Sequence, residues 1–228
     1  MERPVRRGGY KFYWSGGDKG MGGVGIMVAK EWVSSVIEVK RVSDRMMVIR
    51  MSVGKGVLNV VSVYGPQSGR PMVEKEDFYS ELHKILLGVG AAEKVVLCGD
   101  FNGHVGEKAE GFEGVHGGKG FGSRNLEGEM LLEFADSMGL VITNTWFDKE
   151  EAQKVSYESV VCRTVVDYVL VRKGERASVM DVDVRVIRNG ACILQHKVMV
   201  CRLIVRDNGR KKRKEKFVSK CKNGGEHA

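Results

Sequence analysis

Short apolar runs rich in β-branched residues recur along the chain, with turn residues between them. Several of these runs alternate apolar and polar positions as half-buried strands do, and others are apolar throughout, as is typical of strands buried on both faces. The pattern predicts ten strands, at residues 11–14, 23–29, 36–39, 45–51, 57–64, 95–98, 140–145, 166–172, 181–187 and 197–205.

Two segments have the period of a helix instead. Residues 74–88 place Phe78, Leu82, Ile85 and Leu86 on one face and stop at Gly88. Residues 125–140 stop at Gly139, with a predicted core stripe of Leu126, Met130, Phe134 and Met138. Strands dominate each half of the chain and each half has one helix, which favours two packed sheets with helices on their outer faces and also permits a barrel.

The segment 106–124 contains seven glycines and has no periodicity. It is predicted to be a long surface loop, a kind of segment that is often functional. Its sequence does not match the GxxxxGK[ST] pattern of a phosphate-binding loop, so no nucleotide cofactor is expected.

Size and composition fit one soluble α/β domain. The chain has 228 residues, 43% of them hydrophobic and 29% charged, with a net charge of +8. No run approaches the roughly 18 apolar residues of a membrane span, and the first residues lack the apolar centre of a secretory signal. The expected location is therefore nuclear or cytoplasmic, with neither secretion nor membrane contact.

Much of the positive charge lies in the last part of the sequence. Residues 206–228 contain nine Lys or Arg and three acidic residues. We therefore expect a domain over residues 1–205 and a basic, disordered tail over 206–228. The tail could contact nucleic-acid phosphates or act as a nuclear localisation signal, and a solvated end without function is an equally good interpretation.

Polar side chains stand at the ends of several predicted strands. In VVLCGDFNGHVGE, Asp100 and Asn102 follow a buried strand and alternate, so they are expected to point the same way. Tyr64 ends one strand, Asp167 opens another, and His196 opens the last. Taken singly, each has an ordinary structural explanation as packing, turn or surface chemistry. Together they could serve phosphodiester hydrolysis, which needs an activated water and donors for the developing charge.

The succession of VYGP, GDFNGHVG, RNLEGEMLLEFADSMGLVITNT, VDYVLV and QHKVMV closely resembles the endonuclease/exonuclease/phosphatase family. Within that family the resemblance is strongest to endonuclease domains of non-LTR retrotransposons and to craniofacial development protein 2-like proteins. It extends from about Tyr10 to about Arg206. It implies a four-layer α/β sandwich of the DNase I-like type, two mainly antiparallel sheets flanked by helices, and hydrolysis of DNA phosphodiesters with Mg²⁺ or Mn²⁺.

The resemblance also implies roles for individual residues. Asp100 matches the residue that orients or deprotonates the attacking water, and Asn102 matches its partner that holds the phosphate and the water. Tyr64 and His196 match residues that contact the scissile phosphate, and Asp167 matches the carboxylate that supports the hydrogen-bond network. One further match, Asn125 in RNLEGE, is expected near the substrate groove.

Two departures from the family pattern concern the metal. Members begin with a strand bearing an Asn and a second bearing a Gln-Glu pair whose Glu is the principal metal ligand, and no such segment precedes Tyr10. Gln195 also stands where many relatives have an Asp. Asp100 is then the candidate ligand that remains. We expect weakened Mg²⁺ binding, an uncovered sheet edge or apolar face, and weak or no nuclease activity of the chain by itself.

Three functions therefore stay open. The first is a metal-dependent DNA endonuclease of the retrotransposon type. The second is a catalytically inactive, domesticated or decayed remnant that binds nucleic acid or a protein partner. The third, a phosphatase acting on a small or lipid phosphate, is disfavoured because the resemblance is stronger to the retroelement branch.

Overall fold

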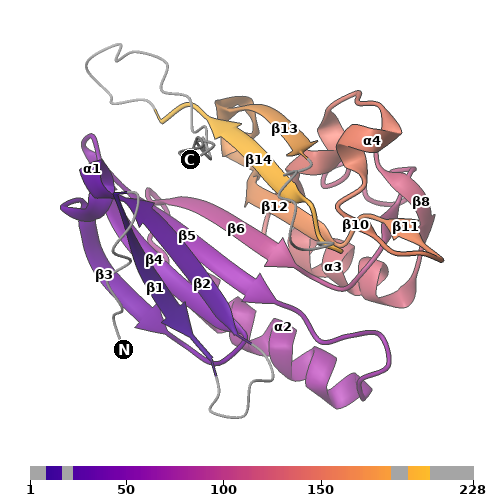
Figure 1. Ribbon diagram of the computed structural model, residues 1–228, viewed down its shortest axis with the longest axis horizontal. Helices are drawn as coiled ribbons and strands as arrows, with labels where there is room; N and C mark the ends of the chain where they lie inside the picture. Colours follow the sequence, from indigo (N-terminus) through magenta and orange to yellow (C-terminus); the bar gives the residue numbers. More distant parts are fainter. Residues whose placement is uncertain (1–8, 17–22, 186–194, 206–228) are drawn as a thin grey trace, which may run out of the picture.

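A six-stranded sheet forms the centre of the protein (Figure 1). The computed structural model describes residues 9–16, 23–185 and 195–205. All neighbouring strands of this sheet are antiparallel except β5 and β6, which are parallel. In spatial order the strands are β3 (Val36–Arg41), β4 (Met46–Val53), β5 (Gly56–Tyr64), β6 (Lys94–Asp100), β12 (Asp167–Arg172) and β9 (Leu140–Ile142).

Two long helices cover one face of this sheet. Helix α2 (Met72–Leu87) makes the crossover that two parallel neighbours such as β5 and β6 require. Helix α3 (Leu126–Ser137) follows the glycine-rich segment. Both helices pack on Val61, Val63 and Leu97 of the sheet.

The predicted core stripe is confirmed at Phe78, Leu82 and Leu86 of α2, which are buried. In α3 the prediction is partly wrong. Leu126 is 55% exposed, whereas Leu131, Leu132 and Ala135 are fully buried. The helix turns its 131–135 side toward the sheet, because its first turn is held against the loop at His104 and cannot also place Leu126 in the core.

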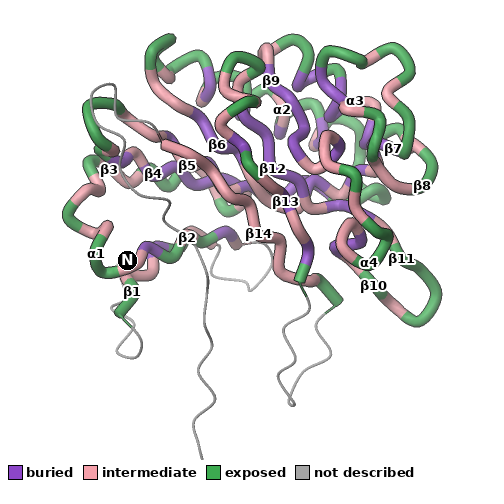
Figure 2. Tube along the Cα trace, turned by 90° about the horizontal axis from the view of Figure 1, so that it is seen from above, coloured by how far each residue is buried: buried purple, intermediate pink, exposed green. Residues whose placement is uncertain are grey.

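Two strand pairs cover the opposite face of the sheet, as Figure 2 shows from above. Strands β1 (Tyr10–Ser15) and β2 (Val24–Ala29) pack over Met47, Ile49 and Met51 of β4. Strands β13 (Val179–Arg185) and β14 (Val198–Leu203) pack over Val96 of β6 and over β12. The predicted α/β class with two packed, mainly antiparallel layers is confirmed. In the described residues the second layer consists of two separate pairs and not of one continuous sheet.

Short elements complete the fold: α1 (Lys30–Val33), β7 (Val105–Gly106), β8 (Phe121–Arg124), α4 (Glu151–Lys154), β10 (Tyr157–Glu158), β11 (Arg163–Thr164) and 3-10 turns at Thr143–Trp146 and Lys173–Ser178. The strand predicted over 140–145 ends early, at Ile142. The Thr143 hydroxyl donates to the Val169 carbonyl and that of Thr145 to the Ile142 carbonyl, and such local bonds compete with a strand ladder.

The glycine-rich segment 106–124, predicted to be a long surface loop, contains paired strands and buried residues. Strands β7 and β8 pair within it, and Val115 and His116 are buried. The His116 Nε2 lies 3.1 Å from the Gly106 carbonyl oxygen, and its Nδ1 accepts a hydrogen bond from the Gly118 N–H. The ring therefore has to be neutral, and burial lowers the pKa of His116 to about 4.

The two hydrogen bonds of the neutral His116 ring predict that the fold is sensitive to acid. The folded-state pKa of His116 lies below its unfolded value, so its contribution to stability is complete above about pH 6.5 and is lost as pH falls toward 4. Between pH 7 and pH 4.5 the wild type should lose about 2 to 3 kcal/mol more unfolding free energy than His116→Gln. Urea unfolding at both pH values measures this. The exposed His83 on α2 gives the control, His83→Gln, which should follow the wild type; equal pH dependence of wild type and His116→Gln would contradict the prediction.

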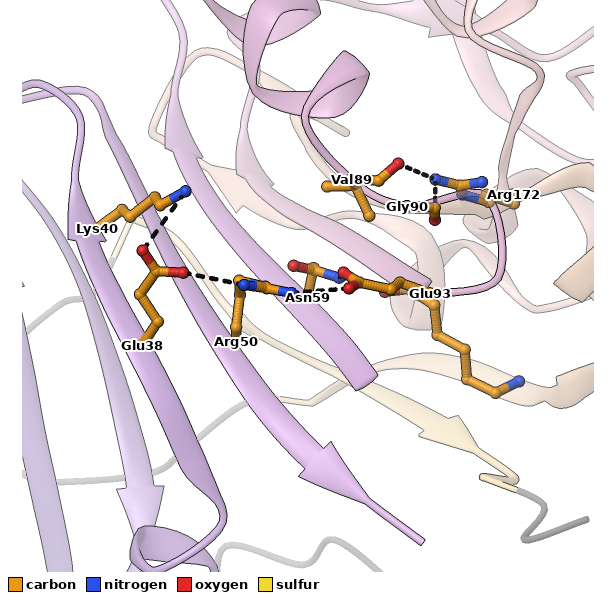
Figure 3. A network of polar contacts seen from close by, with 9 residues as sticks. Glu38, Lys40, Arg50, Asn59, Val89, Gly90, Glu93 and Arg172 are labelled. Carbon is orange, nitrogen blue, oxygen red and sulfur yellow. Dashed lines mark hydrogen bonds and ion pairs between the residues drawn. The ribbon is translucent and has the colours of Figure 1, made fainter. Parts of the chain in front are cut away.

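A polar network fixes the end of the central sheet that lies away from Tyr64 and Asp100 (Figure 3). Arg50 of β4 donates to Glu38 of β3 and to Glu93, which precedes β6. The buried Asn59 of β5 donates to the same Glu93 carboxylate. These contacts join four consecutive strands of the sheet, so the opposite end, where the polar strand-end residues lie, is held in a fixed register.

The described helices include none with the length and apolar content required to cross a bilayer. The basic tail predicted over 206–228 lies outside the described residues.

Candidate active site at the Asp100 end of the sheet

Three of the predicted site residues stand in one row across the central sheet. Tyr64 at the end of β5 pairs with Asp100 at the end of β6. Asp100 pairs in turn with Asp167 at the start of β12. Because paired residues on neighbouring strands point to the same face, the register alone brings the phenol and both carboxylates together.

Glycine at position 99 makes this row possible. Gly99 has φ +150°, and a Cβ there would lie 1.9 Å from the Val63 carbonyl oxygen of β5. No side chain fits at that distance, so only glycine lets β6 continue to Asp100 beside β5. The strand therefore includes Gly99 and Asp100, two residues more than the apolar run indicated.

Asp100 and Asn102 come together through a turn and not through strand alternation, which corrects the extended geometry predicted for them. Asn102 has φ +51°, in the left-handed region that Asn tolerates better than most residues. Its N–H donates to Asp100 Oδ1 at 2.8 Å, and its side-chain amide donates to the Gly65 carbonyl at 2.9 Å. Both side chains are thereby fixed in orientation, with Asn102 linking the loops that follow β5 and β6.

His196 is held by Asp167. Its Nδ1 lies 3.0 Å from Asp167 Oδ2, and its Nε2 lies 3.9 Å from Asp100 Oδ2, too far for a hydrogen bond. Tyr157 forms a β-bridge with His196 and packs its ring against the imidazole edge, with centroids 5.0 Å apart. Half of the His196 side chain stays open to solvent, so the imidazole is oriented and accessible.

These surroundings raise the pKa values of Asp100 and His196. Burial raises the pKa of Asp100 to about 6, with the Asp167 charge adding to the rise and the Asn102 N–H opposing it. The hydrogen bond from His196 to Asp167 raises the pKa of His196 above its ordinary value. A carboxyl with a pKa of about 6 and an imidazole with a raised pKa are a suitable base and acid for hydrolysis.

Tyr64 lies at the edge of this group. Its hydroxyl accepts a hydrogen bond from Gln67 at 3.4 Å. The Arg45 guanidinium lies 5.2 Å from its ring centroid and donates to the carbonyls of Tyr64 and Gly65. A fixed cation therefore stands behind the phenol, where an anionic ligand would benefit from it.

Asn125 has a structural task in this arrangement. It is the N-cap of α3, and its Oδ1 accepts from the N–H groups of Gly128 and His104. Gly128 packs so closely that a Cβ would lie 1.8 Å from the His104 carbonyl oxygen. The side chain thus ties α3 to the loop that begins with Asn102, and the predicted contact of Asn125 with substrate stays a prediction.

Two residues that sequence reasoning did not single out complete the site. The Ser156 hydroxyl, fully buried, accepts from the N–H groups of Val166 and Asp167. The Asn144 side chain donates to the Asp167 carbonyl and accepts from the Val169 N–H. Asn144 lies near the end of the strand predicted over residues 140–145 and could have been suspected, whereas nothing in the sequence distinguishes Ser156 from other loop serines.

The family resemblance implies a divalent metal. The described residues contain no group of three or more His, Cys, Asp or Glu side chains that could hold an ion. Asp167 is engaged by His196, and one oxygen of Asp100 by Asn102. Since Mg²⁺ prefers several oxygen ligands, the described residues do not by themselves fit a resident metal site.

No family model matches the sequence. The chain is 29% identical to craniofacial development protein 2 of Bos taurus over 182 residues, which cover 79% of the chain and 30% of the relative. It is 27% identical to that of Tragulus javanicus over 182 residues, with 79% of the chain and 31% of the relative covered. The chain thus spans about a third of the length of the curated relatives that it matches.

Solved structures with the same fold include three nucleic-acid enzymes. The endonuclease domain of TRAS1, a telomere-specific non-LTR retrotransposon, superposes with a TM-score of 0.61 at 14% identity, over 86% of this chain and 78% of that domain. An Asp→Asn variant of the 3′ phosphatase NExo from Neisseria bound to product DNA hairpin gives 0.61 at 19%, over 86% and 80%. An AP endonuclease from Archaeoglobus fulgidus gives 0.62 at 17%, over 86% and 80%.

The chain therefore has the DNase I-like α/β fold of these solved structures, and its sequence is similar to craniofacial development protein 2.

Proposed function

We propose that this chain carries the water-activating and phosphate-binding part of a retrotransposon-type DNA endonuclease. The observation that carries the proposal is the row Tyr64–Asp100–Asp167 with His196 bonded to Asp167. In this proposal Asp100 accepts the proton of the attacking water, and Asn102 orients the Asp100 carboxylate. His196 donates through Nε2 to a phosphate oxygen, and Tyr64 contacts the same phosphate.

The geometry suits these roles. The 3.9 Å between His196 Nε2 and Asp100 Oδ2 is too long for a hydrogen bond, so neither group occupies the hydrogen-bonding atom of the other. It is short enough for both to contact one phosphodiester group and its attacking water. Asp167 keeps the imidazole in one orientation and stabilises its positive charge as charge develops on the phosphate.

A second candidate function has its own support. An inactive protein that binds nucleic acid or a protein partner would keep the fold while tolerating the incomplete set of metal donors among the described residues. The nuclease resemblance implies Mg²⁺ or Mn²⁺, and the donors described here would hold either ion weakly.

Supercoiled-plasmid nicking in Mg²⁺ and in Mn²⁺ separates the two candidates. The nuclease proposal expects nicking by the wild type and none by the Asp100→Ala, His196→Ala double variant. Equal nicking by the wild type and the double variant would overturn the nuclease proposal and favour the inactive binding protein. Release of phosphate from a 3′-phosphorylated oligonucleotide by the same preparation would identify a phosphatase instead.

The pKa shifts predict a bell-shaped pH profile for nicking. Activity should rise as pH increases through about 6, because Asp100 must be deprotonated to act as a base. It should fall above the raised pKa of His196, which donates only when protonated. Asp167→Asn removes the main cause of the His196 shift and one cause of the Asp100 shift, so both limbs should move to lower pH. If both limbs of the pH profile stay where they are in the wild type, Asp100 and His196 are not the base and the acid.

Residues 206–222 are proposed to add phosphate contacts, on the basis of their charge alone. Deleting them should weaken DNA binding and flatten the dependence of the binding constant on salt. A protein that makes fewer phosphate contacts releases fewer counterions from the DNA when it binds. Fluorescence anisotropy with a labelled duplex at several salt concentrations measures the slope. An unchanged slope would leave the tail without a role in DNA binding.

A further inference from the structure

Ser156 is a polar residue in the core, in the short segment that joins α4 to β10. It is 0% exposed, and a hydroxyl so placed is unfavourable unless hydrogen bonds replace those that it made with water. Its Oγ lies 3.2 Å from the nitrogen of Val166 and 3.2 Å from that of Asp167, and it accepts from both N–H groups. Ser156 therefore satisfies two main-chain donors at the point where β12 begins.

The main chain of Asp167 is held at both of its polar groups. Its N–H donates to Ser156 Oγ, and its carbonyl oxygen accepts from Asn144 Nδ2 at 3.1 Å. The strand register also places it opposite Asp100. The Asp167 carboxylate, which meets His196 Nδ1 at 3.0 Å, can then move only through its own side-chain torsions.

The carbonyl of Ser156 holds the segment that carries His196. It accepts from the N–H of Lys197, the residue after His196, at 2.7 Å. Tyr157, which follows Ser156, forms a β-bridge with His196. The Lys197 ammonium lies 2.6 Å from a carboxylate oxygen of Glu158 and reinforces the attachment, with only 12% of the Lys197 side chain exposed. Ser156 is thus bonded by its main chain to one half of the histidine–carboxylate pair and by its side chain to the other.

We propose that Ser156 is a positioning residue, whose hydroxyl fixes Asp167 and whose carbonyl fixes the His196 segment, so that the carboxylate and the imidazole meet in one geometry. Ser156 acts through His196, and its consequence for nicking rests on the function proposed above. A carboxylate can only accept hydrogen bonds, so the Nδ1 that faces Asp167 carries a proton. In the neutral ring Nε2 is then the nitrogen without a proton.

The tautomer of His196 tests this positioning directly. At about pH 9, where histidine is neutral, the ring ¹⁵N shifts of the 228-residue chain should identify the Nδ1–H form in the wild type. Ser156→Ala leaves two N–H groups without an acceptor, so the start of β12 should move and the bond from His196 to Asp167 should be lost. The ring should then change toward the Nε2–H form that a free imidazole favours. The exposed His83 is the internal reference.

Two further variants separate positioning from a general loss of stability. Ser156→Thr keeps the hydroxyl and should keep the Nδ1–H form. Asn59→Ala removes another buried polar side chain, which donates to Glu93 at the far end of the sheet (Figure 3). It should lower the urea midpoint, as Ser156→Ala does, and leave the His196 tautomer unchanged. If Ser156→Ala does not fold, Ser156→Cys takes its place, because a thiol is of similar size and only a weak acceptor.

The consequence for the reaction is measured separately. The single-turnover nicking rate of Ser156→Ala should fall about 10- to 100-fold, as expected for a misplaced reacting group, with an unchanged affinity for duplex DNA. The proposal is overturned by a wild-type ring in the Nε2–H form, by an unchanged tautomer or rate in Ser156→Ala, or by an equal tautomer change in Asn59→Ala. If the wild type does not nick and the tautomer changes as expected, the positioning by Ser156 stands and the nuclease function alone fails.

Discussion

Asp100→Asn is expected to lower the rate of plasmid nicking by about 10²- to 10⁴-fold, the usual contribution of a general base. Asn keeps the shape of Asp100 and the oxygen that accepts the Asn102 N–H, but it cannot take a proton from water. The loss should appear in the rate constant under single-turnover conditions with saturating protein, because the groups proposed to contact phosphate are untouched.

The same substitution should not weaken the fold. Burial and the neighbouring Asp167 charge both raise the pKa of Asp100, so its charge is unfavourable where it lies. The neutral amide should leave the urea midpoint unchanged or slightly higher at pH 8. Asp136→Asn is the matched control, since Asp136 is an exposed residue of α3 paired with Lys173 at the opposite end of the sheet. An Asp100→Asn protein that nicks at more than a tenth of the wild-type rate would exclude Asp100 as the base.

Lys75→Met should lower the free energy of unfolding by about 3 to 5 kcal/mol, the cost of leaving a buried charge without its partner. Lys75 Nζ lies 2.7 Å from Glu127 Oε1 and 2.8 Å from the Ser68 carbonyl oxygen. Only 7% of the Lys75 side chain and 11% of that of Glu127 are exposed. The exposed pair Lys173–Asp136 offers the control, because Lys173→Met should cost at most about 1 kcal/mol.

Two further measurements separate a lost ion pair from lost packing. Lys75→Met with Glu127→Leu removes both charges and should recover most of the stability. The cost of Lys75→Met should also shrink at acid pH. Burial by itself raises the pKa of Glu127, but the hydrogen bond and charge of Lys75 outweigh it, so the wild-type carboxyl titrates below its ordinary value. Without Lys75 the pKa rises, and protonation relieves the buried charge. A cost independent of pH and of Glu127 would contradict this account.

This ion pair also bears on the site. Through the Ser68 carbonyl, Lys75 holds the loop that follows Tyr64, and Glu127 lies in the first turn of α3, next to the Asn125 cap. The loops after β5 and β6 are thus connected through α2 and α3. A destabilised pair should therefore loosen both loops before the central sheet unfolds.

The local pattern determined most of the elements. Alternating β-branched runs specified the strands of the central sheet, because a strand with one or two buried faces leaves a period that sequence retains. The helix predicted over residues 74–88 from Phe78, Leu82 and Leu86 corresponds to α2, Met72–Leu87. The sequence also placed Tyr64, Asp100, Asp167 and His196 at strand ends, and the succession of motifs around them carried the family resemblance that connected them.

Tertiary structure alone decided how these pieces meet. The register that aligns Tyr64, Asp100 and Asp167 depends on hydrogen bonds between strands far apart in sequence. The face of α3 that enters the core depends on the hydrogen bond between its N-cap Asn125 and the His104 N–H. The core position predicted for Leu126 was therefore wrong. The Ser156 contact with the Asp167 N–H has no local signature either. Periodicity records which side of an element is buried, whereas the pairing partners of strands and the pKa shifts of the site arise only when separate elements come together in space.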